Sequence, residues 1–510
     1  MSSLRRDAGM KSPKEGTYSV EGARVASTIT AREMRGNASC EVRRGHTTND
    51  GGDSITPSEG RTPAACKPVQ HRGELHSAGA TVTGGTRIRR LELFLDRLYQ
   101  CAKADRHKVF HSLHDKLCSM DLLIEAWNRV AENRGVAGID RETIQDIREY
   151  GSERYLMELQ QELIHETYRV ECVRRVFIPK PDGKQRPLGI PTVRDRIVQQ
   201  AVKMLMEPIF ETDFRDCSYG YRPNRSAKQA SLEIRKYLNF GCTNVIDIDI
   251  EDFFGSIDHG MLISFVGDRI ADPYILKLIR EWLRAGVVHE GELTYPEAGT
   301  PQGGVISPLL ANIYLNRLDT AWKNSGMEGR QFDAHLVRYA DDILVLASKD
   351  VSEPMLLLKS VLESLKLRLS SEKSRMTTAK EGFDFLGFHF IRAMNKRKGK
   401  ELNYFFPSAK SVRKFRDKVR EIVPLTRAHR KGEEQAVKEL NRLITGWTNY
   451  FNHTNANNVY KKLDRYLSWK ATKYYCRVHK IPRVSAEKGV RDRMYAIGLK
   501  ELKGSIQYAY

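Results

Sequence analysis

Long apolar runs are missing from this chain. No stretch approaches the about 20 consecutive apolar residues that a membrane-spanning helix needs, and the N-terminus lacks an apolar signal-peptide core. We therefore expect a cytoplasmic protein without a membrane partner. Paired cysteine motifs are missing too, because the eight cysteines include no Cys-x-x-Cys pair and the histidines suggest no metal cluster. This spacing argues against a zinc knuckle or a disulfide framework, and it favours reduced structural thiols.

Acidic residues are outnumbered along the whole sequence. The 510 residues include 84 Lys and Arg against 64 Asp and Glu, which gives a formal net charge of +20. Because the basic residues are not confined to one tail, the field of the protein attracts polyanions, and nucleic acid is the leading partner. The length exceeds that of one ordinary hydrophobic core and predicts two or three folded units.

Large apolar residues are scarce in residues 1–85, where Gly, Ser, Thr, Arg and Pro dominate. Such a segment cannot bury enough apolar surface to order itself, so we expect a disordered tail. Helical periodicity begins near Ile88, and Asp121 is a candidate N-cap of a later helix. Helices and strands then mix in an α+β order. From residue 395 the sequence predicts a separate helical domain to residue 485, followed by a tail over 486–510.

Two strand-like segments, residues 174–179 and 186–191, flank a Pro- and Gly-containing turn and predict a hairpin. Lys180, Lys184 and Arg186 concentrate positive charge in this hairpin. Cations so placed suit a triphosphate, although a solvated lysine-rich hairpin is the simpler alternative.

Carboxylates occur in two apolar strand patterns. Residues 244–250 form an apolar strand that carries Asp247 and Asp249 on one face, and burying them is costly unless a cation compensates. Asp341 and Asp342 lie at a tight turn between two strands that look buried on both sides. A polar hairpin tip is the alternative. Shared carboxylates are what two Mg²⁺ ions about 3.5–4 Å apart require when they clamp the attacking and leaving oxygens in nucleotidyl transfer.

At this point the sequence resembles a known family. Tyr339-Ala340-Asp341-Asp342 is similar to the signature of reverse transcriptases, and residues 249–259 resemble the first palm motif of group II intron-encoded proteins. The resemblance implies a right-hand polymerase, with an N-terminal extension and fingers over residues 86–240. It also implies a palm with an antiparallel sheet over residues 241–394, followed by an α-helical thumb and maturase domain.

The resemblance also implies roles for individual residues. Asp249, Asp341 and Asp342 would be catalytic and would hold two Mg²⁺ ions, with the Ile250 carbonyl as a further ligand. Phe254 would contact the nucleotide and screen against a 2′-hydroxyl group.

Three further motifs of the family concern the nucleotide. Residues 177–188 resemble the fingers motif, in which Lys180 and Arg186 would contact the triphosphate. The glycine-rich segment before Ser307 resembles the loop that lines the nucleotide pocket, with Gln302 near the sugar and base; taken alone, it is also a loop that caps a helix at Ser307. Lys373 resembles the lysine that could protonate the leaving pyrophosphate, with an ordinary surface lysine as the alternative.

The region beyond residue 395 is similar to the thumb and maturase domain of group II intron proteins. Aromatics among cations suit RNA through stacking and phosphate contact, although a basic helical bundle with an aromatic core explains many of the aromatics. The candidate RNA-binding residues are Lys396, Arg397, Lys398, Arg413, Lys414, Trp447 and Tyr450.

The resemblance therefore implies an RNA-directed DNA polymerase that copies RNA, in particular group II intron RNA, into cDNA from dNTPs. It further implies a maturase that binds the intron RNA and assists its splicing, with template, primer, and DNA target or cDNA as partners. The paired cysteines of the His-Asn-His endonuclease are missing, so we expect no second-strand cleavage. A domesticated reverse transcriptase in DNA repair or phage defence and a non-catalytic RNA-binding splicing factor remain alternatives, and the oligomeric state is open.

Overall fold

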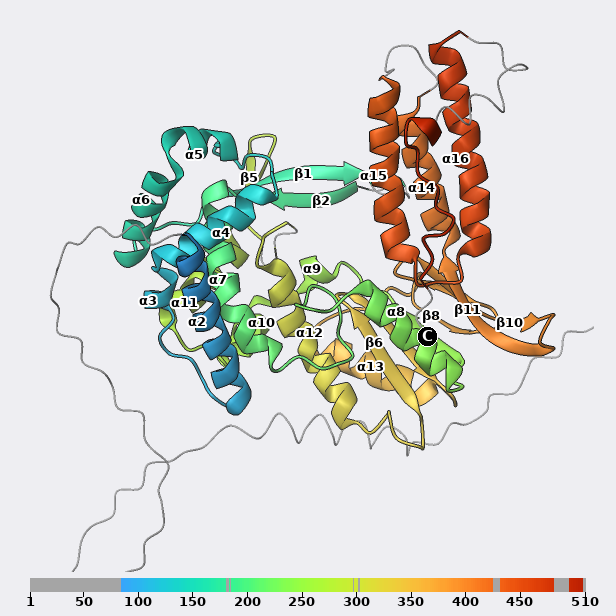
Figure 1. The fold of residues 1–510 in the computed structure, drawn as a ribbon. Helices are drawn as coiled ribbons and strands as arrows, with labels where there is room; N and C mark the ends of the chain where they lie inside the picture. Colours follow the sequence, from blue (N-terminus) through green and yellow to red (C-terminus); the bar gives the residue numbers. More distant parts are fainter. Residues whose placement is uncertain are drawn as a thin grey trace, which may run out of the picture. The chain divides into compact units, whose positions relative to one another are not determined.

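The computed structural model describes residues 84–179, 183, 185–296, 298–300, 303–424, 432–480 and 495–507 (Figure 1). The chain divides between Thr83 and Gly84 into two units, and all described residues belong to the second unit. Helices and strands are mixed along it, which confirms the α+β class. Among the described residues, no helix combines the length and the apolar character needed to cross a membrane.

Helices come first in the described unit. Leu91 and Leu98 of the first helix are buried, as the predicted periodicity requires, and this helix packs against α4 and α7. α4 begins after Ser119, so Asp121 lies in its first turn and the predicted N-cap at Asp121 is wrong. The helices of this part are α2 (Gly84–Ala104), α3 (His114–Leu117), α4 (Met120–Glu132), α5 (Ile144–Tyr150), α6 (Ser152–Ile164) and α7 (Val193–Glu211).

A small four-stranded sheet combines two strands that lie between α6 and α7 in the sequence with two strands that follow α11. β1 (Val173–Pro179) and β2 (Gln185–Ile190) pair antiparallel, with Arg174 opposite Ile190, so the predicted hairpin is confirmed. β4 (Val287–His289) pairs parallel to β1, and β5 (Glu292–Thr294) completes the order β2-β1-β4-β5.

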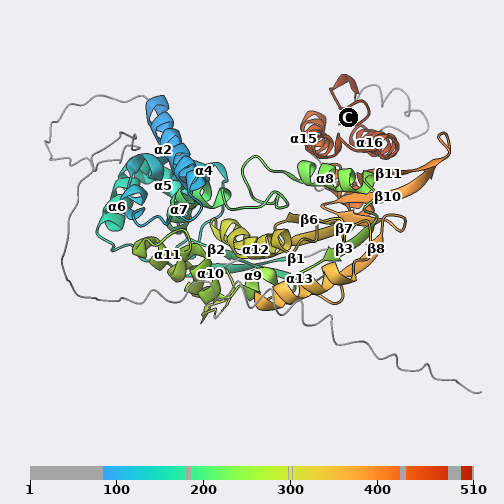
Figure 2. The same ribbon diagram turned by 90° about the horizontal axis from the view of Figure 1, so that it is seen from below.

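The central sheet has the strand order β6-β7-β3-β8, and every neighbouring pair in it is antiparallel. Figure 2 shows these strands beside one another, between α8 on one side and α13 on the other. The strands are β3 (Asn244–Ile248), β6 (Ala334–Tyr339), β7 (Asp342–Ala347) and β8 (Arg375–Thr378). The helices around the sheet are α8 (Ala227–Asn239), α9 (Phe253–Ser256), α10 (His259–Gly267), α11 (Pro273–Arg284), α12 (Ser307–Asn324) and α13 (Ser352–Ser364).

Both faces of the central sheet are buried, and each belongs to a different hydrophobic core. Successive side chains of a strand point to opposite faces. Ile343 and Val345 of β7 therefore enter the core built with α7, α12 and α13, whereas Leu344 and Leu346 enter the core built with α8 and the C-terminal helices. The predicted burial of these strands on both sides is confirmed, and it explains their nearly continuous apolar sequence.

The segment just after residue 395 differs from the expected helical domain. β10 (Phe388–Asn395) and β11 (Lys400–Pro407) form an antiparallel hairpin, joined to β9 (Phe383–Phe385), so the first part of the expected helical domain over 395–485 forms a strand instead. Aromatic packing explains the strands, because the Phe390 ring stacks on that of Phe405 at 5.5 Å between centroids. The basic residues Lys396, Arg397 and Lys398 lie in the turn of this hairpin.

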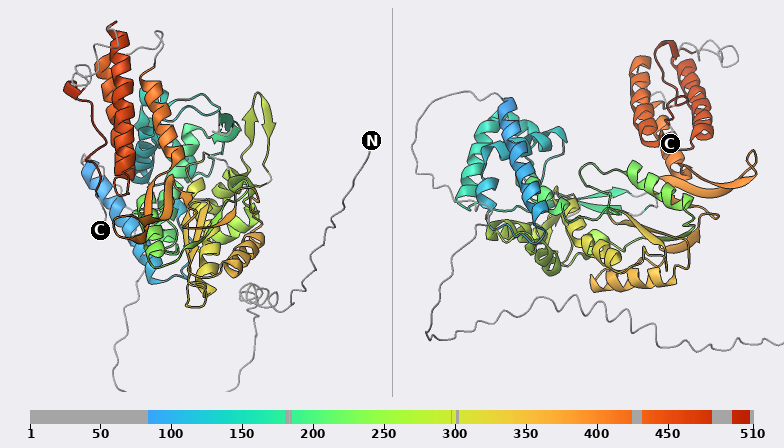
Figure 3. Two further views of the ribbon diagram at one scale, coloured as in Figure 1. Left: turned by 90° about the vertical axis from the view of Figure 1, so that its right-hand side faces the viewer. Right: turned by 60° about the horizontal axis from the view of Figure 1, so that its bottom comes forward.

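The C-terminal helices are α14 (Ala409–Ile422), α15 (Glu433–Phe451) and α16 (Asn457–Val478), and Figure 3 shows them side by side. α14 contacts both of the others. This bundle is tied to α8 by the bond between Ser231 Oγ and His453 Nε2, at 2.9 Å, and to β11 by the Asn455 N–H, which donates to the Phe405 carbonyl at 2.8 Å. It therefore shares one core with the second face of the central sheet.

Asp272 organises the junction between α3 and α11 and generates a test of the fold. Its buried carboxylate accepts hydrogen bonds from the backbone N–H groups of Leu113, His114, Tyr274 and Ile275, at 2.7–3.1 Å. The change Asp272→Ala removes the acceptor for all four donors and should lower the free energy of unfolding by about 2–3 kcal/mol, seen as a lower denaturation midpoint in urea. Asp115→Ala, at an exposed carboxylate, is the matched control, and equal losses in both variants would contradict this account.

Candidate active site

The predicted tight turn between β6 and β7 is present and has two residues. Tyr339 pairs with Asp342, so Ala340 and Asp341 form the turn itself. Ala340 has φ 57°, in the left-handed region that non-glycine residues seldom adopt. The turn therefore places two adjacent acids at the tip of a hairpin whose strands are buried on both sides.

A fully buried cation, Arg338, holds this turn in place. Its Nη1 donates to the carbonyl of Ala340 at 2.9 Å and to Oδ1 of Asn312 at 3.0 Å, while its Nε donates to Oδ1 of Asp319 at 2.8 Å. The Arg338 and Asp319 side chains both have 0% of their surface exposed. Because an unpaired buried charge is strongly unfavourable, the pair fixes β6, α12 and the turn relative to one another.

The backbone of residues 217–221 supports the same turn from outside the sheet. The Arg338 N–H donates to the Cys217 carbonyl at 2.8 Å, and the Tyr219 N–H donates to the Arg338 carbonyl at 2.9 Å. A Cβ on Gly220 would meet the backbone nitrogen of Ala340, so only glycine permits this approach. The Asn312 amide donates to the Gly220 carbonyl at 2.8 Å, which joins this segment to the Arg338 network.

Asp249 lies just beyond β3, where the loop over residues 370–374 holds it. Its carbonyl accepts from the Ser370 N–H at 2.9 Å, and its N–H donates to Ser374 Oγ at 3.2 Å. The ammonium of Lys373 lies 2.8 Å from its carboxylate. Asp247, which has no predicted role, pairs with Arg375 at 3.3 Å.

The four acids of the region repel one another, with Asp342 exposed at the start of β7 and the other three partly buried. Burial, followed by the charges of Asp341, Asp249 and Asp247, raises the pKa of Asp342 to about 6. Burial also raises the pKa of Asp341, with the Arg186 charge acting in the opposite direction. Such a group stores electrostatic repulsion that a cation would relieve.

The donor set fits a hard divalent ion. Asp249, Asp341 and Asp342 offer carboxylate oxygens, the ligands that Mg²⁺ prefers. In the described part of the chain these oxygens do not all lie within 4.8 Å of one another, so an ion would have to draw them together. Ile250, whose carbonyl is the further predicted ligand, has a buried side chain and forms an isolated bridge with Leu369.

Two predicted nucleotide contacts, Lys180 and Gln302, lie outside the described residues, as does the neighbouring hairpin cation Lys184. Arg186 is exposed at the start of β2, and its charge reaches Asp341, so the structure places it on the side of the acids. Phe254 is half-buried, with its ring against Phe253 at 5.3 Å.

The glycine-rich loop before α12 contacts two segments beside the acids, the Phe254 backbone and strand β2. The Thr300 N–H donates to the Phe254 carbonyl at 2.7 Å, and a Cβ on Gly303 would meet the carbonyl of Gly189 in β2. The N-cap of α12 is Ile306, and Ser307 is the first helical residue, so the predicted cap at Ser307 is wrong. The side chain of Gln199 anchors the loop instead, by accepting from the Val305 N–H at 2.9 Å.

The predicted RNA-binding residues fall into two groups. The cations are exposed, with Lys396, Arg397 and Lys398 in the β10–β11 turn and Arg413 and Lys414 on α14. The aromatics are engaged within the protein. The Trp447 ring contacts Phe415, Phe451 and Tyr460, and Tyr450 stacks on Phe388 at 5.1 Å while its hydroxyl donates to the Leu386 carbonyl.

Sequence reasoning missed the residues that position the acids, Arg338 with Asp319, Asn312 and Gly220. A signal for one of them exists, because a lone arginine inside an otherwise apolar strand demands a buried counter-charge. It also missed the exposed side of α16, where Trp469 is 47% exposed and the Lys473 ammonium lies 3.5 Å from its ring centroid.

Comparisons with known proteins agree with this geometry. Residues 178–390 match the family model described as reverse transcriptase (RNA-dependent DNA polymerase), and residues 412–494 match the group II intron maturase-specific domain. Protein YkfC of Escherichia coli is 36% identical over 52% of this chain and 78% of its own length. Group II intron-encoded protein LtrA of Lactococcus lactis is 35% identical over 44% of this chain. An uncharacterized 91 kDa protein in the cob intron of Schizosaccharomyces pombe is 37% identical over 41% of it. The matched region spans only 37% of LtrA and 26% of the Schizosaccharomyces pombe protein.

Loss of the counter-charge of Arg338 should be far more damaging than loss of a surface ion pair. Asp319→Ala leaves a buried guanidinium without its carboxylate, and we expect the free energy of unfolding to fall by about 3–5 kcal/mol, measured by urea denaturation. Asp268→Ala, which breaks the exposed pair with Arg317, should cost less than about 1 kcal/mol. Similar midpoints for the two variants would show that Arg338 does not depend on Asp319.

Replacing Asp342 by Asn should stabilise the protein in a chelator, with a defined pH dependence. The carboxyl group titrates near pH 4 in the unfolded chain and near 6 when folded, so the wild type loses stability as pH rises through this window. Because the side chain is partly exposed, solvent screening limits the expected gain of Asp342→Asn above this window to about 1 kcal/mol. Melting curves of both proteins across this range test it. A gain that is already complete below pH 4, or a loss at pH 8, would contradict the assignment.

Proposed function

Since the chain belongs to the reverse transcriptases of group II introns, we propose that it is an RNA-directed DNA polymerase that copies RNA into cDNA and also binds intron RNA to assist splicing. One observation carries the catalytic part of this proposal. Asp249, Asp341 and Asp342 lie at neighbouring ends of β3 and β7, in surroundings that raise the pKa of the last two. Without a bound cation, this repulsion between carboxylates would only lower the stability of the folded protein.

In the proposed active site these three carboxylates and the Ile250 carbonyl would hold two Mg²⁺ ions, which would supply Lewis acidity for nucleotidyl transfer. The role of the protein is to hold the acids in position. The Arg338 network fixes the turn that carries Asp341 and Asp342, and the 370–374 loop fixes Asp249. Lys373 lies 2.8 Å from Asp249 and so beside the proposed metal site, where it would donate a proton to the leaving pyrophosphate.

The incoming dNTP is proposed to lie between the acids and the β1–β2 hairpin. Arg186, whose charge reaches Asp341, would contact the triphosphate together with Lys180. Phe254 is fixed through the hydrogen bond of its carbonyl to Thr300, and its half-buried ring would exclude a 2′-hydroxyl group. Gln302 would contact the sugar and base from the glycine-rich loop.

We propose the parts of a right-hand polymerase from the reverse transcriptase family match and the arrangement of the strands. The fingers include β1 and β2, within residues 86–240, and the palm holds the central sheet, within 241–394. The hairpin β10–β11 crosses the expected boundary at residue 395. The helical thumb and maturase domain is therefore better started at α14 (Ala409–Ile422), close to residue 412, where the maturase-specific match begins.

Intron RNA and the template–primer duplex are proposed to contact exposed cations of the C-terminal part. Lys396, Arg397 and Lys398 extend from the hairpin turn, and Arg413 and Lys414 lie on the exposed side of α14. These side chains can neutralise phosphates. Trp447 and Tyr450 pack in the core that the C-terminal helices share with the central sheet. We therefore expect their replacement to lower the stability of the fold more than it weakens direct RNA contacts.

The catalytic proposal is tested by Asp341→Asn in purified protein. Because the carboxylate is expected to bind metal, Mg²⁺-dependent extension of a primer on RNA should fall by about 1,000-fold or more. Binding of intron RNA should change less than about twofold, since counterion release by distant cations supplies that affinity. Asp96→Asn, at an exposed acid of α2, is the control and should retain full extension.

Two outcomes would contradict the proposal. Undiminished extension by Asp341→Asn would mean that the metal is held elsewhere. Absence of Mg²⁺-dependent extension in the wild type, together with specific intron binding, would identify a non-catalytic splicing factor.

A further inference from the structure

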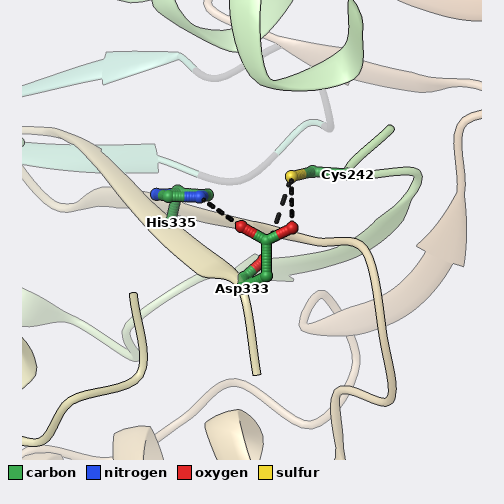
Figure 4. A group of neighbouring side chains, drawn as sticks. All are labelled: Cys242, Asp333 and His335. Carbon is green, nitrogen blue, oxygen red and sulfur yellow. Dashed lines mark hydrogen bonds and ion pairs between the residues drawn. The ribbon is translucent and has the colours of Figure 1, made fainter. Parts of the chain in front are cut away.

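A second group of metal-ligating side chains lies away from the carboxylates of the active site. Cys242, Asp333 and His335 each offer a ligand atom, and these atoms all lie within 4.8 Å of one another. Figure 4 shows the Asp333 carboxylate between the Cys242 thiol and the His335 ring. The distances are 3.0 Å from His335 Nε2 to Asp333 Oδ1 and 3.8 Å from Cys242 Sγ to Asp333 Oδ2.

The register of the central sheet explains why these residues meet. Ala347, the last residue of β7, pairs with Asn244 of β3 on one side and with Ala334 of β6 on the other. Cys242 precedes β3 and Asp333 precedes β6, so the group joins two strands that are not neighbours. Asp342 is five residues earlier on β7, which at the rise of a strand places the group about 17 Å from the acids.

We propose that Cys242, Asp333 and His335 bind a zinc-like divalent transition-metal ion that is separate from the ions of the polymerase site. The ligand types determine the class of metal. A thiolate with an imidazole and a carboxylate suits Zn²⁺ and its spectroscopic substitute Co²⁺, whereas Mg²⁺ and Ca²⁺ prefer oxygen ligands alone. The thiolate and the carboxylate together balance the two positive charges, once the thiol has lost its proton to solvent.

The spacing of the ligand atoms agrees with a tetrahedral ion. From usual zinc bond lengths, a sulfur and an oxygen on the same ion lie about 3.6 Å apart, and a nitrogen and an oxygen about 3.4 Å apart. The observed separations of 3.8 Å and 3.0 Å are similar in size, but they end on the two different oxygens of the Asp333 carboxylate, Oδ2 and Oδ1. A turn of the carboxylate that brings one oxygen to face both the thiol and the imidazole would complete three ligands, and water can take the fourth position.

The surroundings hold the ligands before an ion arrives. The Tyr237 ring stacks on His335 at 4.1 Å between centroids, with an angle of 8° between the planes. Asp333 has φ 46°, and its N–H donates to the Gly329 carbonyl at 2.7 Å. Cys242 is 1% exposed, but the Asp333 side chain is 38% exposed and gives an ion access from solvent. Preorganised ligands lower the cost of binding.

Hydrogen bonding alone explains the group less well. A thiol is a weak donor, and the 3.8 Å contacts of Cys242 with the carboxylate and the carbonyl of Asp333 are near the limit for sulfur. Packing nevertheless holds the buried Cys242 thiol next to the Asp333 carboxylate. An ion would take both groups as ligands and would connect the starts of β3 and β6.

The test is a titration of the chelator-treated full chain with Co²⁺. We expect one Co²⁺ per chain to produce a thiolate-to-cobalt charge-transfer absorption, which Zn²⁺ abolishes by displacement and millimolar Mg²⁺ leaves unchanged. Cys242→Ser should remove this absorption, and His335→Gln should weaken Co²⁺ binding by about 100-fold or more. Cys101→Ser, at an exposed cysteine, is the control and should bind as the wild type does.

A second measurement uses unaltered protein in case a variant fails to fold. In mild urea, Zn²⁺ should slow alkylation of Cys242 but not of Cys101, as mapped by peptide mass spectrometry. Co²⁺ binding that survives Cys242→Ser and His335→Gln, or alkylation of Cys242 that Zn²⁺ does not slow, would overturn the proposal. Primer extension with Mg²⁺ is scored separately, so failure of the zinc site and failure of the polymerase assignment remain distinguishable.

Discussion

The buried guanidinium of Arg338 is the constraint on which the rest of the site depends. A cation without exposure to water must find its carboxylate, and Asp319 on α12 provides it. The remaining donors of Arg338 then bond to Asn312 and to the carbonyl of Ala340. Sheet, helix and turn are thus joined by one side chain, and the strained conformation of Ala340 is maintained by contacts that a solvent-exposed turn would not have.

A sheet buried on both faces gives the acids their unusual environment. Because β7 alternates between two cores, the face that carries Leu344 and Leu346 also carries Asp342 at its end. Asp247 and Asp249 follow Val245 on the same face of β3. The carboxylates are therefore the polar end of an apolar surface, and burial is the largest cause of the raised pKa of Asp342. The same packing that positions the acids raises the pKa of Asp341 and Asp342.

The sequence predicts best where local pattern and tertiary structure agree. The β1–β2 hairpin, the two-sided burial of β3 and β7 and the two-residue turn at Ala340 follow from alternation, turn residues and apolar runs. The hairpin β10–β11 was missed because its cations suggested a helix, while the Phe390–Phe405 stack that stabilises it exists only after pairing. Trp447 shows the same limit, since an aromatic that stacks on RNA and one that packs in a core have the same sequence signal.

Sequence spacing also hides the group at the other end of the sheet. Cys242 and Asp333 are 91 positions apart, so neither cysteine pairs nor histidine clusters indicate them, and only the register of β7 brings them together. Ligands of different chemistry therefore lie near the two ends of β7. Carboxylates alone at Asp342 favour a hard ion, whereas a thiolate and an imidazole near Ala347 favour a softer one. An ion at the Ala347 end would connect β3 and β6 on either side of β7. The ion would then fix the start of β6, whereas Arg338 fixes its other end and the turn that carries Asp341 and Asp342.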